Sequence, residues 1–181
     1  AEGDLFTNPT PGTHYNMYVS TSKDVFVYQG VGGPGSEANQ GMFFVPPLSC
    51  GSRGDVDNIP QIDKIGDREF SGGLSIVTRD GAEVFINNTI ISNQPAGITV
   101  DGPVTVEGKT THVSYRITGL SGNISVNSSD ELYVAYFNSN GAATSGSFYS
   151  GFSSNPLLDL DLTASKLGSC ISDSGTSNVV L

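Results

Sequence analysis

The sequence predicts an all-β protein, built as a β-sandwich or a closed β-barrel of short antiparallel strands. Apolar residues recur at every second position over many short stretches, and turn-forming residues separate these stretches. No stretch shows the 3.6-residue apolar period of a helix. The 23 glycines, the 9 prolines and a charged fraction of only 14% also disfavour a helical bundle in a chain of 181 residues. Together these observations favour many short strands joined by tight turns.

The chain is expected to begin with an irregular lead-in over residues 1–16, because Pro9, Pro11 and Gly12 lie close together there. The strands that follow are predicted from alternating aliphatic and aromatic residues, which mark one buried face per strand. These residues are Met17, Val19, Val25, Val27, Leu74, Ile76, Val84, Ile86, Val104, Val106, Val113, Tyr115, Ile117, Ile124, Val126, Leu132 and Val134. Turn signals separate them at 22–24, 79–81, 87–88, 101–103, 107–109 and 121–123.

Three segments lie outside this regular pattern. Residues 50–70 break the alternation and hold five acidic residues, so we expect a long excursion from the strands. Residues 157–162 alternate leucine with aspartate and form a further strand candidate. Residues 171–181 are rich in serine and glycine and are expected to form a linker or tail. The folded part is therefore predicted to be a single β-sandwich module over residues 17–170.

An internal pseudo-repeat is the most informative pattern. Residues 17–27 align with residues 124–134, and residues 38–44 align with residues 143–149. Each copy reads as strand, polar turn and strand, followed by a small-residue loop and by a glycine before two aromatic residues. The two loops are Gly30–Gln40 and Phe137–Ser145. The repeat predicts a pseudo-twofold pair of strand motifs whose loops emerge together and share a hollow, although a general likeness between β-hairpins is the alternative.

Charge and hydropathy exclude several classes of partner. The formal net charge is −10, and the eight lysines and arginines are scattered singly. Without a basic stripe, nucleic acids and anionic membranes are poor partners. No apolar run approaches the roughly 18 residues that a membrane span requires, so membrane insertion is not expected.

Motifs for catalysis are missing from the sequence. His14 and His112 are the only histidines, and neither accompanies a nucleophile signature. The G-x-S-x-G, H-E-x-x-H and phosphate-binding glycine motifs are absent. Glycoside hydrolysis needs only two carboxylates, so the 18 acidic residues leave a small polysaccharide-degrading enzyme as an alternative. An all-β module without a long cleft-forming insertion favours a non-catalytic role.

Two further groups of residues have a predicted chemical role. Asp55, Asp57 and Asn58 offer the oxygen ligands that Ca²⁺ prefers, so calcium is a candidate ligand, and a solvated acidic loop is the alternative. Cys50 and Cys170 lack C-x-x-C spacing and are predicted to form an intrachain disulfide, because the polar, lysine-poor composition is typical of exported proteins. Two free buried cysteines are the alternative.

Sugar recognition by a β-module commonly uses aromatic faces for stacking and amide or carboxylate groups for hydroxyls. Such residues gather in the two repeated units, although some of them are equally suited to packing the core or completing turns. The predicted binding residues are Tyr28, Asn39, Gln40, Asn138, Asn140 and Tyr149.

Several longer stretches resemble a known kind of module. They are Met17-Tyr-Val-x-Thr-Ser-Lys-x-Val25, Ala38-Asn-Gln-Gly-Met-Phe-Phe-Val-Pro-Pro-Leu-Ser-Cys50, Asp57-Asn-Ile-Pro60, Gly73-Leu-x-Ile-Val77 and Glu131-Leu-Tyr-Val-Ala-Tyr-Phe-Asn-x-Asn-Gly-Ala-Ala-Thr-Ser-Gly-Ser-Phe-Tyr-Ser-Gly-Phe152. Over about residues 15–170, the chain resembles a module of large exported Bacteroidota proteins, which often end in gliding-motility-associated or type IX secretion sorting domains. More distantly it is similar to the IgGFc-binding-protein N-terminal domain of mucin-like secreted proteins.

The resemblance implies a secreted or cell-surface location, neighbouring domains of a larger exported protein, and a non-catalytic role. It brings no catalytic residues and no ligand. With the residue patterns above, we expect a non-catalytic extracellular module that binds a polysaccharide or glycan for adhesion or substrate targeting. A structural spacer of a cell-surface adhesin is the main alternative, and a small polysaccharide-degrading enzyme is the other.

Overall fold

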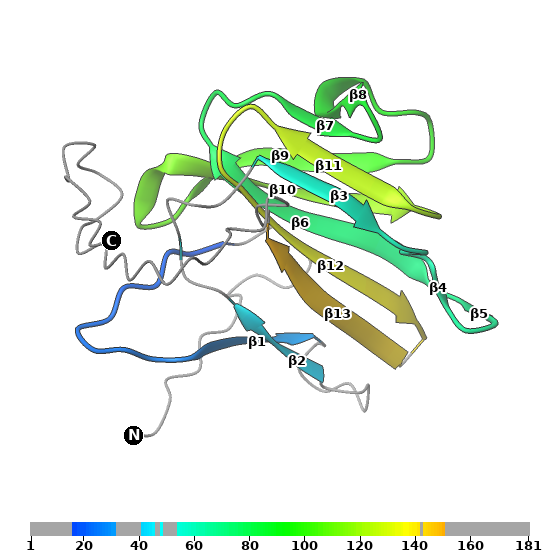
Figure 1. Cartoon of the computed structure of the whole chain (residues 1–181), viewed down its shortest axis with the longest axis horizontal. Coiled ribbons are helices and arrows are strands. Elements are labelled where there is room, and N and C mark those ends of the chain that lie inside the picture. Colours follow the sequence, from blue (N-terminus) through cyan, green and yellow to red (C-terminus); the bar gives the residue numbers. More distant parts are fainter. Residues whose placement is uncertain (1–15, 32–40, 46–47, 49–53, 142, 151–181) are drawn as a thin grey trace, which may run out of the picture.

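The computed structural model describes residues 16–31, 41–45, 48, 54–141 and 143–150, and in this part of the chain the protein is all-β (Figure 1). The strands form two open sheets packed face to face, with two short hairpins beside them. The predicted sandwich is thus confirmed, and the described strands do not close into a barrel. A single short 3₁₀ turn, η1, spans Ile91–Asn93.

The larger sheet has five antiparallel strands in the order β13-β12-β6-β10-β9. Its strands are β6 (Ser71–Arg79), β9 (Thr99–Val106), β10 (Lys109–Leu120), β12 (Leu132–Asn140) and β13 (Ala143–Ser150). The second sheet has four strands in the order β3-β11-β7-β8. These are β3 (Asp55–Ile59), β7 (Val84–Ile86), β8 (Thr89–Ile90) and β11 (Ile124–Ser128).

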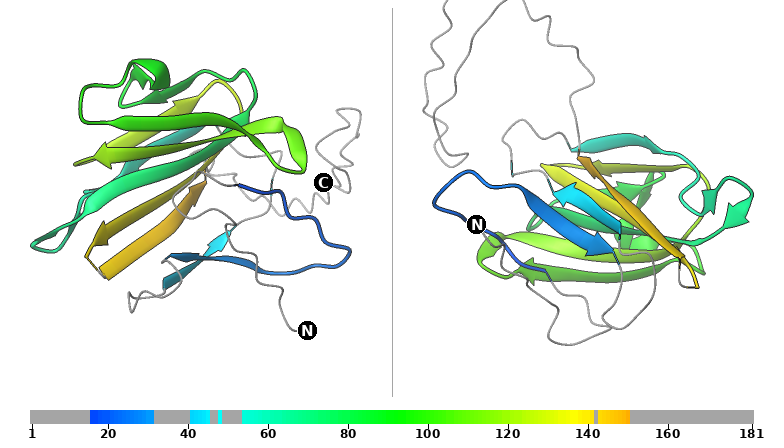
Figure 2. Two further views of the ribbon diagram at one scale, coloured as in Figure 1. Left: turned by 180° about the vertical axis from the view of Figure 1, so that it is seen from behind. Right: turned by 90° about the horizontal axis from the view of Figure 1, so that it is seen from below.

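Two hairpins complete the described part. The strands β4 (Lys64–Ile65) and β5 (Arg68–Glu69) pair at the end of the sandwich, and β1 (Val27–Val31) pairs with β2 (Gly41–Val45). The β1–β2 hairpin lies alongside β13, the edge strand of the larger sheet, and β2 is the nearer of its two strands (Figures 1 and 2).

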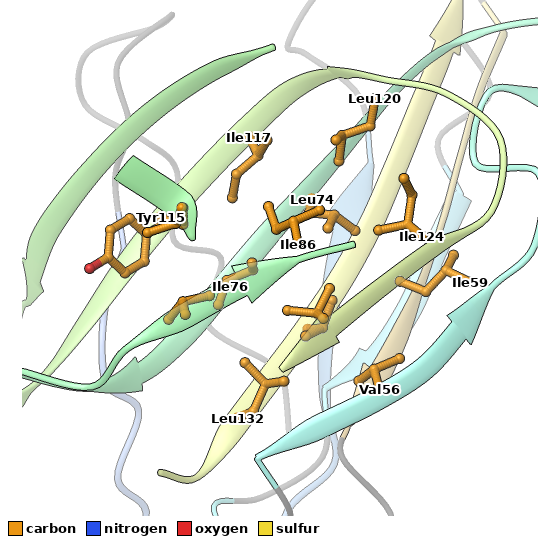
Figure 3. Packing of buried hydrophobic residues seen from close by; sticks show 14 of the residues in the cluster. Val56, Ile59, Leu74, Ile76, Ile86, Tyr115, Ile117, Leu120, Ile124 and Leu132 are labelled. Carbon is orange, nitrogen blue, oxygen red and sulfur yellow. The ribbon is translucent and has the colours of Figure 1, made fainter. Parts of the chain in front are cut away.

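The core lies between the two sheets (Figure 3). Alternate residues of each strand face inward, as the two-residue period of the sequence requires. Leu74, Ile76 and Ile117 of the larger sheet are fully buried, and they pack with Ile86 and Val126 of the smaller one. Burying one such side chain contributes about 1.5 to 3 kcal/mol, so this cluster stabilises the contact between the sheets.

The strand prediction is wrong at the N-terminal end. Met17, Val19 and Val25 lie in irregular chain, although the other predicted strand positions all fall in strands. Val19 and Val25 are exposed, so no buried face corresponds to their alternation. The segment is instead fastened to the turn between β9 and β10, where the Tyr18 amide donates a 2.7 Å hydrogen bond to the Glu107 carbonyl.

The predicted excursion over residues 50–70 is also wrong for its described part, because residues 55–59 form the sandwich strand β3. Val56 and Ile59 are both buried although they lie three positions apart. The register against β11 shifts between these two residues, which marks a β-bulge. The extra residue breaks the two-residue alternation, so the sequence pattern did not predict this strand.

The pseudo-repeat holds only in its second half. Both β1–β2 and β12–β13 are antiparallel hairpins, and their second strands carry the two glycine-aromatic segments of the repeat. Residues 124–134 do not form a hairpin, because β11 and β12 belong to different sheets. The expected loop Phe137–Ser145 is wrong as well: Phe137 lies in β12, and β13 begins at Ala143. Most of the loop Gly30–Gln40 lies outside the described residues.

Other predictions fall on residues that the structure does not describe. Cys50 and Cys170 are among them, so their disulfide stays a prediction. So are the strand candidate at 157–162, the tail at 171–181 and most of the lead-in. Across the described part of the chain, no helix has the length and apolar character to cross a membrane.

Candidate functional site

The candidate site lies on the outer face of the larger sheet, which we define as the face turned away from the core. On β12 the even-numbered residues Leu132 and Val134 point into the core, so Phe137 and Ser139 point to the outer face. Their register partners on β6 are Gly73 and Ser71. These residues therefore form adjacent rows on one rigid surface.

A shallow hollow of about 450 Å³ lies at the end of this face, between the β5–β6 connection and the β12–β13 turn. It is lined by Glu69, Phe70, Ser71, Ser139, Asn140 and Gly141. The lining residues thus include a phenylalanine, a glutamate, an asparagine and two serines, which are residue types suited to binding sugars.

The turn beside the hollow is held in place by its own residues. Gly141 has a φ of +56°, a conformation that glycine adopts without steric cost and that permits a tight turn. Asn140 donates a 2.7 Å hydrogen bond from Nδ2 to the main-chain carbonyl of Glu69. This bond joins the two sides of the hollow, so the shape of the hollow is set by the fold.

Asn138 supports the same turn from inside. Its side chain is 2% exposed, accepts a 2.5 Å hydrogen bond from the Ser145 hydroxyl, and donates a 3.4 Å bond to the carbonyl of Ile62. Burial leaves Asn138 without a surface that a ligand could touch. The structure therefore assigns this predicted binding residue to the interior, as a brace between β12, β13 and the chain after β3.

Phe137 and Arg116 form a stacked pair in the middle of the outer face. The Phe137 ring lies over Gly73, where a Cβ atom would come within 2.6 Å of it. Arg116 on β10 is exposed, and its guanidinium carbon lies 5.5 Å from the centre of the Phe137 ring. Arg116 thus places a positive charge beside the Phe137 ring, in the middle of the outer face.

A second exposed surface lies on the β1–β2 hairpin and includes the predicted residue Tyr28. We call it the aromatic face, and its residues are Phe26, Tyr28, Met42 and Phe44. Phe26 is 81% exposed and Met42 73%. Phe44 lies edge-on to both neighbouring rings, with centroid distances of 6.2 Å to Phe26 and 6.0 Å to Tyr28. An uncharged patch of this kind is typical of a surface that contacts another molecule.

The predicted binding residues that the structure describes do not form one site. Asn138 and Asn140 share an end of the larger sheet, whereas Tyr149 is paired with Val134, six positions from the Asn140 end of β12. At about 3.3 Å per residue, the two ends are roughly 20 Å apart. Asn39 and Gln40 lie outside the described residues. Only Asn140 is both exposed and part of the hollow.

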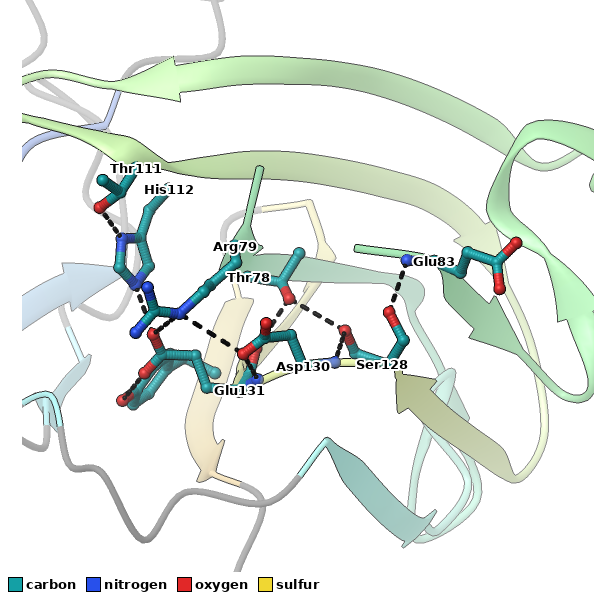
Figure 4. Close-up of polar contacts among 10 residues, drawn as sticks. Thr78, Arg79, Glu83, Thr111, His112, Ser128, Asp130 and Glu131 are labelled. Carbon is teal, nitrogen blue, oxygen red and sulfur yellow. Dashed lines mark hydrogen bonds and ion pairs between the residues drawn. The ribbon is translucent and has the colours of Figure 1, made fainter. Parts of the chain in front are cut away.

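A network of polar side chains joins the two sheets at another corner (Figure 4). His112 is 2% exposed, and its Nε2 lies 2.9 Å from Glu131 Oε1. The same carboxylate lies 2.9 Å from Arg79 Nε and accepts a 3.0 Å hydrogen bond from the Tyr133 hydroxyl. Thr78 donates a 2.7 Å bond to the Glu131 carbonyl. Since its polar groups are directed at one another, this network braces β6, β10 and β12.

One ionisable group in the core has a shifted pKa. Burial, and secondarily the Asp80 carboxylate, raise the pKa of Tyr115 above its ordinary value of 10.0. Both effects disfavour the charged phenolate. Tyr115 belongs to the core cluster, which explains the shift without any functional role.

The candidate calcium ligands lie on a strand and not in a loop. Asp55, Asp57 and Asn58 belong to β3, an edge strand of the smaller sheet, and Asp57 and Asn58 are exposed. Asp63, which belongs to the same acidic stretch, accepts a 2.7 Å hydrogen bond from the Gly122 amide. Among the described residues, no three His, Cys, Asp or Glu side chains are grouped so that they could hold a metal ion.

Comparison of the chain with protein-family models, with curated proteins and with solved structures found no match.

The sequence patterns missed Glu69, Phe70, Arg116 and Phe137. One signal was present, because a glycine inside a strand often marks a close approach of another group, and Gly73 lies opposite Phe137. Arg116 gave no such signal. Its position depends on the register of β10 against β6, which joins residues about forty positions apart.

Proposed function

We propose that the protein is a non-catalytic extracellular module that binds a polysaccharide or glycan through the outer face of its larger sheet. The observation that carries the proposal is the hollow beside Asn140, which is lined by phenylalanine, asparagine, glutamate and serine residues. Aromatic rings stack on the apolar faces of sugars, and the polar groups match their hydroxyls.

The rigid sheet that carries the site is a second reason for proposing glycan binding. Phe137 and Ser139 lie on a central strand of a five-stranded sheet, and Asn140 ends that strand. Side chains on a sheet are held in place by their neighbours, so they lose little conformational freedom when a ligand binds. A sheet with a shaped, partly polar outer surface thus suits recognition of an extended polymer.

The biological setting is part of the same proposal. Resemblance to modules of exported surface proteins favours a secreted or cell-surface location, with neighbouring domains in a larger protein. In that setting, binding serves adhesion or directs a larger protein to its substrate. The absence of catalytic motifs from the sequence supports a module that binds without cleaving.

Affinity electrophoresis against algal, plant and host polysaccharides tests the proposal. We expect retardation on at least one polymer, and we expect Phe70→Ala to weaken it about threefold to tenfold by removing a stacking surface. Phe85→Ala is the matched control, because Phe85 is also half-buried but lies on β7 in the other sheet. Equal loss in both variants, or unchanged binding in Phe70→Ala, contradicts the site.

Other outcomes of this experiment support the alternatives. No retention on any polymer, with or without calcium, supports a structural spacer. Release of reducing ends or of unsaturated products from a retained polymer supports a small polysaccharide-degrading enzyme. Each result replaces the binding proposal with a different class of protein.

We also propose calcium as a ligand of Asp55, Asp57 and Asn58, on the strength of their oxygen donors. Thermal unfolding with excess calcium and with chelator tests this proposal. A higher unfolding temperature in calcium, lost in Asp57→Asn, supports it. An unfolding temperature that is the same in both solutions contradicts it.

A further inference from the structure

Arg116 is a cation of the outer face whose side chain is restricted before any ligand binds. Arg116 is exposed on β10, and its guanidinium lies against the ring of Phe137. Stacking restricts the motion of the long side chain, while the edges of a stacked guanidinium keep their hydrogen-bond donors. A restricted arginine loses less freedom on binding a ligand than one that moves freely in solvent.

The ring beneath Arg116 is itself held firmly. Phe137 lies over Gly73, where any larger residue would meet the ring at 2.6 Å and the Ile117 carbonyl at 2.8 Å. The glycine therefore provides the space in which the ring lies, and the ring in turn supports the guanidinium. Three strands contribute to this stack, since Gly73 is on β6, Phe137 on β12 and Arg116 on β10.

No carboxylate of the described chain forms an ion pair with Arg116. The ion pairs found in the described residues join Arg79 and His112 to Asp130 and Glu131. Asp101 on β9 is the register partner of Arg116. The guanidinium is therefore exposed and stacked on Phe137, without a contact carboxylate among the described residues.

We infer that Arg116 binds the carboxylate of an acidic sugar, such as a uronic acid, within the glycan that the outer face recognises. This inference rests on the function proposed above. A guanidinium is the side chain best suited to a carboxylate, because its donors match both oxygens at once.

The positions of these residues indicate how the glycan chain lies along the sheet. Arg116 lies in the row of Ser75 and Ala135, and Ser139 lies four residues further along β12. At about 3.3 Å per residue, this separation is roughly 13 Å along the strand. The ligand is therefore longer than one sugar, with its acidic unit at Arg116 and hydroxyl-bearing units beside Asn140 and Glu69. The Glu69 carboxylate disfavours a second acidic unit at that end.

The net charge of −10 does not exclude such a ligand. At physiological ionic strength the Debye length is about 8 Å, so charges elsewhere on the surface are largely screened, whereas a contact ion pair persists. Binding is then governed by the local cation and not by the sum over the molecule.

The test uses matched acidic and neutral polymers. Polygalacturonate, alginate and hyaluronate are each compared with their carboxyl-reduced forms in affinity electrophoresis of the full chain. We expect retention on at least one acidic polymer and its loss on the reduced form. Arg116→Gln should weaken binding about tenfold or more, because a charge-assisted hydrogen bond is lost. Arg116→Lys should recover only part of it, since an ammonium lacks the fork of donors.

Lys109→Gln is the control, because Lys109 also lies over an aromatic ring, 5.2 Å from the centre of Tyr18, but near the β9–β10 turn. Its removal lowers the net charge equally and should leave binding unchanged. Equal weakening by Lys109→Gln and Arg116→Gln overturns the inference, since binding would then follow overall charge. Retention of neutral glycans alone, independent of Arg116, overturns the inference and leaves the proposed function standing. Retention of no polymer overturns both.

Discussion

Gly73 determines how closely Phe137 can approach the larger sheet. With no Cβ at this position, the aromatic ring lies directly on the backbone of β6 and supports Arg116. The glycine is not required by backbone conformation, because positive φ is not found at this position. Its role is to leave space, and the outer face depends on that space.

We expect Gly73→Ala to destabilise the protein by about 1 to 3 kcal/mol, because the added methyl group meets both the Phe137 ring and a main-chain oxygen. Chemical denaturation measures the change. Gly30→Ala is the control, since nothing lies within 4 Å of its added Cβ atom. Unchanged stability in Gly73→Ala, or an equal loss in both variants, contradicts this description of the stack.

Glu131 is the centre of the polar network, and its carboxylate contacts His112, Arg79 and Tyr133. We expect Glu131→Gln to lower the free energy of unfolding by about 1 to 3 kcal/mol, because buried donors lose a charged acceptor. Asp130→Asn should cost less, since the Asp130 side chain is 47% exposed and lies 3.4 Å from Arg79. Denaturation of both variants tests the order, and an equal or reversed order shows that the network does not brace the corner.

Tyr115 makes the stability of the protein depend on pH in the alkaline range. Its folded pKa is raised above the ordinary value of 10.0, so the folded state holds the proton more tightly than the unfolded state. Its contribution is complete below pH 10 and is lost as the pH rises through the folded pKa. We expect Tyr115→Phe to remove part of the fall in unfolding temperature above pH 10. An identical pH profile for the variant contradicts the shift.

The β1–β2 hairpin shows how an element can be apolar on both faces. Val27, Phe43 and Val45 on one face are half-buried, and the residues of the aromatic face point the other way. A strand pair of this kind is normally covered on both faces. The exposed side therefore contributes little to the stability of the fold.

We expect Phe26→Ser and Met42→Ser to change the free energy of unfolding by less than about 0.5 kcal/mol, since both side chains already lie in solvent. Binding of a hydrophobic dye should fall in both variants. Phe43→Ser, on the half-buried face, serves as the comparison and should cost more stability. Strong destabilisation by Phe26→Ser would show that the aromatic face is packed in the folded protein.

Element prediction from the sequence succeeded where strands are regular. The marked residues from Leu74 to Val134 alternate within each strand, and every one of them lies in a strand of the structure. It failed at β3, where a bulge places Val56 and Ile59 on one face. It also failed at Val19 and Val25, because alternation predicts a strand but does not supply a partner strand.

At the scale of the whole molecule, the sequence could predict the sandwich but only part of the site. Asn140 was found because polar and aromatic residues gather in the two repeated units of the sequence. Arg116 and Phe137 were not found, because their contact depends on the pairing of β10 and β12 on opposite sides of β6. Asn138 was predicted to bind a ligand, but it is buried. Its burial depends on a long-range contact with Ile62, which the sequence does not reveal. Residue types are visible in a sequence, whereas the faces that they share are set by register.

The central claim is that the outer face, beside Asn140 and Phe137, binds the glycan. The most direct test is a titration of the amide NMR spectrum with an oligosaccharide from any polymer that retards the protein. We expect the largest shifts at residues 69–71, 116, 137 and 139–141, which belong to this face or line the hollow. The strands β3, β7 and β8 of the other sheet should remain unperturbed. Shifts confined to the other sheet or to the aromatic face of the β1–β2 hairpin would contradict the claim.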